Sequence, residues 1–152
     1  MVKVLFVCLG NICRSPMAEA IMKDLVEKEG LKDQISVDSA GTGSWHIGEP
    51  PHQGTKRKLE EYGIKTEGLV ARQFSKEDLE TFDYIIGMDR SNIQNIYQIT
   101  GEPEHPKVMR LLDLTHLKKD VPDPYYTGNF QETYDLVSEG CRVLLAKIKQ
   151  QL

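Results

Sequence analysis

The sequence is short of cysteine and of long apolar runs. Its three cysteines, Cys8, Cys13 and Cys141, are an odd number at unequal spacings, which argues against a disulfide framework. No segment approaches the roughly 18 apolar residues needed to cross a bilayer. A signal peptide needs an unbroken apolar stretch of about 7 to 15 residues, and Asn11 and Arg14 interrupt the only candidate. These absences predict a cytoplasmic protein that does not bind membranes, and they leave secretion without a signal peptide open.

Concentrated basic charge is also missing. The formal net charge is −4 and the sequence pI is near 5.6. The densest basic run, residues 56–58, stands beside Glu60 and Glu61 in a segment that we expect to be a solvent-exposed helix. A nucleic-acid backbone is bound by clustered lysine and arginine, so we do not expect nucleic acid as a partner.

Apolar segments of two different periods alternate along the chain. Lys3–Val7 is apolar on both faces, which is typical of a central strand in a parallel sheet, whereas Phe130–Leu152 repeats its apolar residues every three or four positions. Further strands are predicted over 35–38, 84–88 and 108–111, a helix over 54–62, and helices that begin at the N-caps Ser15, Ser75 and Asp89. This order predicts one α/β domain over residues 1–152, with a mostly parallel sheet of about four strands, helices on both faces, and a phosphate-binding loop between the first strand and the first helix.

The most informative segment is the loop Cys8–Ser15, which follows the first strand and opens the first helix. Ligands of parallel α/β sheets bind at this end of the strands. Backbone N–H groups along the loop can point at one anion, and Arg14 can hold two phosphate oxygens with parallel hydrogen bonds. Gly10 and Asn11 are residue types that tolerate the positive φ of such a tight loop.

Cys8 is the candidate nucleophile of this loop. Its thiolate form must be favoured at neutral pH, and a helix terminus alone contributes only about 0.3 to 2 kcal/mol. Most of the stabilisation must come from Arg14, the loop amides and the hydroxyl of Ser15. The alternative interpretation of Cys8 is a buried cysteine at a strand end. Cys13 either fills space beneath the loop or acts as a resolving thiol for oxidised Cys8, and Cys141 lies on the apolar face of the last helix as a core residue.

A phosphoryl transfer from an ester also needs an acid that protonates the departing oxygen. Asp123 is the candidate, because the prolines on either side stiffen its loop and Tyr125 and Tyr126 offer aromatic surface beside it. Asp113 and Asp120 are competitors, and the Asp-Pro pair is equally typical of a plain turn.

Several motifs together resemble those of the low-molecular-weight protein tyrosine phosphatases. They occur in the order of that family and extend over nearly the whole chain, at Val4–Glu19, Val37–Thr42, Val70–Gln73, Phe82–Ile86, Met88-Asp89 and Asp123–Tyr126. The combination of the Cys8–Ser15 loop with a distant Asp-Pro-Tyr-Tyr segment is specific, whereas either half alone is not.

The resemblance implies a role for each candidate. Cys8 would form a phosphocysteine, Arg14 would bind the transferring phosphoryl group, and Asp123 would protonate the leaving oxygen and then activate water. Asn11 would hold the loop by a bond towards Ser39, and Ser15 would bond to the thiolate. The expected phosphate- and substrate-binding residues are Leu9, Gly10, Asn11, Ile12, Cys13, Ser15, Trp45, His46, Tyr125 and Tyr126, with Trp45 and His46 forming a pocket wall opposite the two tyrosines. The resemblance also implies phosphotyrosine-containing proteins as substrates, with no metal or cofactor, and it leaves the oligomeric state open.

Two positions and two alternatives bear on this interpretation. Many relatives have a loop-supporting histidine where this chain has Leu69. A subgroup that resembles arginine phosphatases has Thr in place of Ile12, so Ile12 favours phosphotyrosine over phosphoarginine. An arsenate reductase of the same fold would need two further cysteines, which the middle of this chain lacks. A non-hydrolytic phosphocarrier or phosphate-binding module would not need an acid at Asp123.

Overall fold

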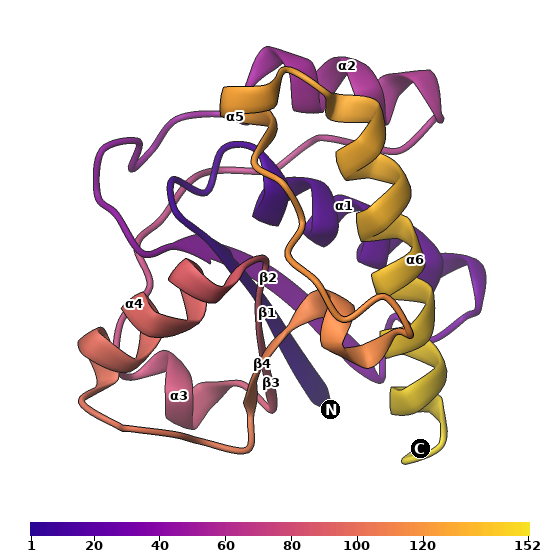
Figure 1. Ribbon diagram of the computed structural model, residues 1–152. Helices are drawn as coiled ribbons and strands as arrows, with labels where there is room; N and C mark the ends of the chain where they lie inside the picture. Colours follow the sequence, from indigo (N-terminus) through magenta and orange to yellow (C-terminus); the bar gives the residue numbers. More distant parts are fainter.

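Four parallel strands in the order β2-β1-β3-β4 form the centre of the computed structural model, which describes residues 1–152 (Figure 1). The strands are β1 (Val2–Cys8), β2 (Ile35–Gly41), β3 (Tyr84–Gly87) and β4 (Val108–Arg110). β1 pairs with β2 on one side and β3 on the other, and β3 pairs with β4. The predicted parallel sheet of about four strands is therefore confirmed.

Helices cover both faces of this sheet. On one face α1 (Arg14–Lys28), α2 (Gln53–Glu61) and α6 (Phe130–Lys149) pack against one another, and α3 (Asp78–Thr81) and α4 (Arg90–Thr100) lie on the other (Figure 1). A 3-10 turn (Leu111–Leu114) and the short helix α5 (Pro124–Thr127) lie between β4 and α6. No helix of the protein combines the length and the apolar character needed to pass through a bilayer.

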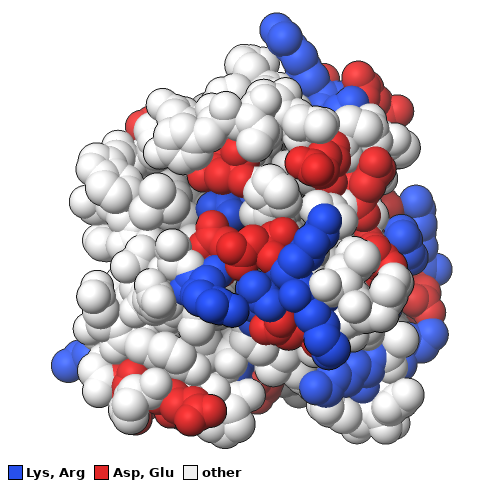
Figure 2. All heavy atoms as spheres, in the orientation of Figure 1, with Lys and Arg blue, Asp and Glu red and all other residues white.

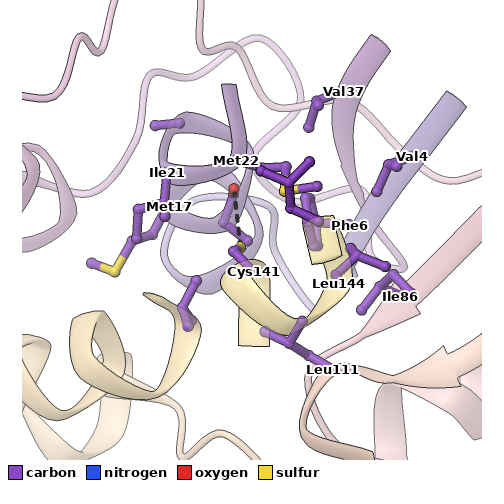
Figure 3. Close-up of a cluster of buried hydrophobic side chains, with 14 of the residues drawn as sticks. Val4, Phe6, Met17, Ile21, Met22, Val37, Ile86, Leu111, Cys141 and Leu144 are labelled. Atoms are coloured by element: carbon purple, nitrogen blue, oxygen red, sulfur yellow. Dashed lines mark hydrogen bonds between the residues drawn. The ribbon is translucent and has the colours of Figure 1, made fainter. Parts of the chain in front are cut away.

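β1 lies between two hydrophobic cores. Val4, Phe6 and Cys8 belong to the larger core on the side of α1 and α6, whereas Leu5 and Val7 belong to the smaller core on the side of α4. Figure 3 shows side chains of β1, α1 and α6 pointing toward one another in the larger core. Because side chains on both faces of β1 are fully buried, the strand delivers Cys8 to a fixed position at its carboxyl end.

Two predicted helix caps are wrong. Ser15 is not an N-cap, because α1 begins at Arg14, so that Ser15 lies in its first turn with its hydroxyl 3.0 Å from the sulfur of Cys8. Ser75 does not cap α3, which begins only at Asp78. The backbone N–H of Ser75 instead donates a hydrogen bond to the carboxylate of Asp78, 2.9 Å away, just before the helix begins.

The other predicted elements are present with shifted ends. β2 runs past Asp38 to Gly41, and the last helix ends at Lys149 rather than Leu152. β4 ends at Arg110 rather than at Leu111, because Leu111 begins the 3-10 turn and packs in the core with α6. The N-cap at Asp89 is confirmed, since its carboxylate accepts from the N–H of Asn92 at 2.7 Å.

The carboxyl ends of β1 and β3 form the edge at which the site lies. From this edge β1 continues into α1 on one face of the sheet, and β3 continues into α4 on the other. Because the segments that follow two neighbouring strands turn to opposite faces of the sheet, a crevice opens between them at the sheet edge. Open α/β sheets bind ligands in such a crevice. Cys8 ends β1, and Asp89 follows β3 after one further residue.

Candidate active site

The loop between β1 and α1 has a row of free amide donors. The backbone N–H groups of Leu9, Gly10, Ile12, Cys13, Arg14 and Ser15 donate no hydrogen bond within the protein. The N–H of Asn11 points at the sulfur of Cys8, 3.3 Å away. The loop thus offers several donors around one thiol at the start of a helix, an arrangement suited to an anion.

Only one residue of this loop adopts a positive φ. Asn11 has a φ of 56°, whereas Gly10, for which the sequence also predicts this conformation, does not. Asn11 alone therefore supplies the left-handed conformation of the loop. Glycine is needed at position 10 for a different reason, which is space. A Cβ there would lie 3.1 Å from the ring of His46, so a glycine lets the pocket wall approach the loop.

The end of β2 supports the loop from behind. The N–H groups of Thr42 and Gly43 donate to the carbonyls of Cys8 and Leu9 at 2.9 and 2.8 Å. A Cβ on Gly41 would lie 2.9 to 3.0 Å from backbone atoms of the loop, including the carbonyl oxygen of Leu9 and the N–H nitrogen of Asn11. Only glycine permits this close approach of two backbones.

A buried polar network fixes Asn11 and reaches the sulfur. The side-chain amide of Asn11 donates to the hydroxyls of Ser15 at 2.7 Å and Ser39 at 2.9 Å, and its side-chain oxygen accepts from the N–H of Arg72 at 3.0 Å. The Ser15 hydroxyl in turn lies 3.0 Å from the sulfur of Cys8. The two contacts that the resemblance implies, Asn11 with Ser39 and Ser15 with Cys8, are both present in the structure.

Arg14 is held closely at Nη1 and at longer range at Nη2, and only its Nε has no partner. Its Nη1 donates to Asp89 at 2.6 Å and to the carbonyl of Val121 at 2.9 Å, and its Nη2 is 3.4 Å from Asp123. Its Nε is buried without a partner. Burial alone would lower the pKa of Arg14, but Cys8, the bond to Asp89 and the charge of Asp123 raise it above its ordinary value. The Nε–Nη2 edge of this permanently charged group can therefore take two oxygens of a bound anion.

These groups line a cavity of about 290 Å³. Cys8 and Arg14 lie in it with Asp123, whose carboxylate also caps α5 by accepting from the N–H of Tyr125 at 3.1 Å. Of the remaining predicted residues, Leu9, Gly10, Ile12, Cys13, Trp45, His46, Tyr125 and Tyr126 line the cavity, whereas Asn11, Ser15 and Ser39 form the buried network behind it. Trp45 and Tyr126 are 68% and 75% exposed, so aromatic surface surrounds a buried thiol.

The competing acids lie elsewhere. Asp113 and Asp120 both pair with Arg110, at 2.7 and 2.9 Å, and neither lines the cavity. Figure 2 shows acidic and basic side chains side by side on the face that it presents, rather than gathered into areas of one sign. No group of three or more His, Cys, Asp or Glu side chains is placed to share a metal ion.

The other two thiols are in environments that disfavour the thiolate. Burial, and then the charges of Cys8 and Asp123, raise the pKa of Cys13 to about 12. Cys141 is fully buried in the core of Figure 3, where burial raises its pKa and its sulfur donates to the carbonyl of Ala18 at 3.8 Å. The core position predicted for Cys141 is therefore confirmed.

Comparison with known proteins agrees with this geometry. The sequence model of the family described as low molecular weight phosphotyrosine protein phosphatase matches residues 3–152. The chain belongs to this family. Its relatives include the low molecular weight protein-tyrosine-phosphatase YfkJ of Bacillus subtilis, 54% identical with 99% of this chain and 98% of the relative covered. The crystal structure of YfkJ superimposes with a TM-score of 0.96, over 99% of this chain and 96% of that one.

Two further comparisons lie at greater distance within the same fold. The low molecular weight protein-tyrosine-phosphatase PtpA of Staphylococcus epidermidis is 48% identical, with 95% of this chain and 92% of the relative covered. A crystal structure described as a Drosophila arginine phosphatase is 36% identical, with a TM-score of 0.86 over 97% of this chain and 98% of that one.

For this low molecular weight phosphatase, sequence reasoning missed three residues that hold the site, two through their side chains and Arg72 through its backbone N–H. It predicts Asp89 only as a helix cap, although its place after β3 puts it at the same sheet edge as Cys8. Glu19 and Arg72, which bind Ser39 and Asn11 respectively, carry no signal of their own in the sequence. Their contacts join residues that are far apart in the chain.

Proposed function

We propose that the protein hydrolyses phosphotyrosine in protein substrates through a cysteinyl-phosphate. The observation that carries the proposal is the loop itself, in which free backbone amides and the Nε–Nη2 edge of Arg14 surround the sulfur of Cys8. These donors can hold the equatorial oxygens of a phosphoryl group while the sulfur approaches phosphorus. The family to which the chain belongs supports the same chemistry.

Two steps complete the reaction. In the first, the thiolate of Cys8 bonds to phosphorus, the bond from phosphorus to the tyrosine oxygen breaks, and protonated Asp123 gives its proton to that oxygen. In the second, the carboxylate of Asp123 takes a proton from a water molecule, whose oxygen bonds to phosphorus as the sulfur leaves. The products are tyrosine and inorganic phosphate, and the thiolate is regenerated. Arg14 binds the phosphoryl oxygens throughout, and no metal ion takes part in either step.

Depth of the pocket is the basis for selecting tyrosine. The thiol of Cys8 is buried at the base, whereas Trp45 and Tyr126 are mostly exposed at the rim. A phosphotyrosine ring is long enough to pass the rim and brings apolar surface to it, whereas phosphoserine holds its phosphate close to the peptide backbone. The rates at which the protein hydrolyses peptides with phosphotyrosine, phosphoserine and phosphoarginine test this selection. Faster hydrolysis of the phosphoarginine peptide would make phosphoarginine, rather than phosphotyrosine, the proposed substrate.

The test of the function is hydrolysis of an aryl phosphate in EDTA by four proteins. We expect activity in the wild type, none in Cys8→Ser, and a loss of roughly 10² to 10⁴ in turnover in Asp123→Ala. Cys141→Ala, which removes a buried thiol that does not line the cavity, is the matched control and retains wild-type turnover. Activity that persists in Cys8→Ser would end the proposal, and indifference to Asp123→Ala would point to a phosphocarrier.

A further inference from the structure

Glu19 is a buried acid that the proposed reaction does not use. It lies on α1 and is only 5% exposed. One of its oxygens accepts from the hydroxyl of Ser39 at 2.5 Å, and the other is 2.5 Å from the ammonium group of Lys23, one turn further along the helix. A carboxylate removed from water needs a cation and hydrogen bonds to remain charged, and these two contacts provide both.

The charge on Glu19 sets the direction of the hydrogen bonds that lead to the sulfur. A carboxylate can only accept, so the hydroxyl of Ser39 donates to it and offers its lone pairs to the side-chain amide of Asn11, 2.9 Å away. That amide also donates to Ser15 at 2.7 Å. Since the Ser15 oxygen accepts from Asn11, its single proton is available for Cys8 at 3.0 Å, the alternative acceptor being the carbonyl of Ala40 at 3.5 Å.

Lys23 is the only cation that contacts Glu19. A cavity of about 540 Å³ is lined by residues of α1, β2 and the segment 65–69, and Lys23 lies in its wall with the apolar side chain of Leu69. The other charged residues of this cavity, none of which contacts Glu19, are Asp24, Glu27, Lys32, Lys65 and Glu67. Leu69 is buried and its side chain cannot hydrogen-bond, so Lys23 and Ser39 are the two side chains that bind the carboxylate of Glu19.

We propose that Lys23 is a positioning residue for Cys8, acting through the chain of contacts Lys23, Glu19, Ser39, Asn11 and Ser15. The ammonium group pairs with the Glu19 carboxylate and holds it where it accepts from Ser39, which fixes the direction of each later hydrogen bond in the chain. Loss of the ammonium group leaves a buried carboxylate without its cation, so the hydrogen bond from Ser39 that orients Asn11 is no longer held in place. The orientation of Asn11 in its left-handed conformation, and the hydrogen bond from Ser15 to the thiolate, are weakened as a result.

The experiment compares two lysines of α1. Lys23→Met removes the proposed partner of Glu19. Lys28→Met is the matched control, because Lys28 forms the same type of pair with Asp24, four residues earlier at 2.9 Å, but Asp24 has no contact with the loop. Two readouts are measured: the pH dependence of the alkylation of Cys8 by iodoacetamide, and kcat and KM for an aryl phosphate. The other ionisable groups that line the cavity are the same in all variants: Cys13, Arg14, His46, Asp123, Tyr125 and Tyr126.

We expect Lys23→Met to move the alkylation profile of Cys8 to higher pH and to lower kcat about fivefold, the factor that corresponds to one ordinary hydrogen bond. Lys28→Met should change neither readout and should lose less thermal stability, because its pair is more exposed, and Lys23→Arg should restore both readouts. In a Glu19→Gln background, Lys23→Met should have no further effect. Equal profiles in Lys23→Met and Lys28→Met, or additive effects of the changes at 19 and 23, would overturn the proposal.

This proposal rests on the proposed function, but the two can fail separately. A wild-type protein that hydrolyses no aryl phosphate would contradict the function, whereas the alkylation profile would still decide the role of Lys23. Should Glu19→Gln not fold, the comparison of Lys23→Met, Lys23→Arg and Lys28→Met decides by itself.

Discussion

Replacing Arg14 by Lys keeps the positive charge but removes the planar guanidinium group and its paired N–H donors. Arg14 is 2% exposed, with its Nη1 held by Asp89 and Val121 and its Nε–Nη2 edge available to the phosphoryl group. A lysine ammonium group is a single point that cannot serve Asp89 and two phosphoryl oxygens together. Two charge-assisted hydrogen bonds to the transferring group, each about 1.5 to 3 kcal/mol, are lost, which corresponds to a fall in kcat of roughly 10² to 10⁴.

The assay is steady-state hydrolysis of an aryl phosphate, with inorganic phosphate as a competitive inhibitor and thermal unfolding as a check on folding. Asp89→Asn is the companion variant, because it removes the opposite charge at 2.6 Å and leaves one side-chain oxygen where Asp89 offers two, to the N–H groups of Arg14 and Asn92. We expect it to lose about tenfold in kcat, less than Arg14→Lys, since the edge that faces the phosphoryl group is intact. A folded Arg14→Lys protein with kcat within tenfold of the wild type would refute the reasoning, since charge alone would then suffice.

Three further predictions concern other parts of the site. Asp123→Asn should slow the hydrolysis of phenyl phosphate more than that of dinitrophenyl phosphate, whose leaving group needs no proton; equal slowing would contradict the role of acid. Gly41→Ala should abolish turnover and destabilise the fold by about 1 to 3 kcal/mol in urea unfolding, because its Cβ would meet loop backbone at 2.9 Å, and a stable, active variant would refute this. Burial raises the pKa of Cys13 from 9.0 to about 12, so the folded protein keeps a proton that the unfolded chain loses, and this group makes stability fall as pH rises from 9 to 12. Cys13→Ala should therefore lose less unfolding free energy between pH 8 and 10.5 than the wild type, and an equal or greater loss would contradict that environment.

The elements that sequence predicts best are those with one strong periodic signal. β1 is apolar at every buried position, and α6 repeats its apolar face over about five turns, so both are recognisable without knowledge of their neighbours. Ser15 and Ser75 look like helix caps because capping is the commonest use of serine before a helix. In the structure the sulfur of Cys8 and the amide of Asn11 take the Ser15 hydroxyl, whereas α3 begins three residues beyond Ser75.

The residues of the candidate site likewise fall into those that the sequence predicts and those that it does not. Cys8 and Arg14 are predictable because they are held within one loop, and Asp123 is predicted from its flanking prolines and tyrosines and from the resemblance to a family. Asp89 and Glu19 are not predictable as partners, because their contacts with Arg14 and Ser39 span 75 and 20 residues of sequence. Such contacts depend on how the strands pair, which local patterns do not determine.

The most direct test of the account is to find where the phosphoryl group goes. The wild type and Asp123→Ala are mixed with an aryl phosphate, stopped within milliseconds in denaturant, digested and examined by mass spectrometry. The account predicts one phosphoryl group on Cys8, transient in the wild type and longer-lived in the variant, because Asp123 also activates the water of the second step. A phosphoryl group on any other residue, or turnover without any phosphorylated protein, would contradict it.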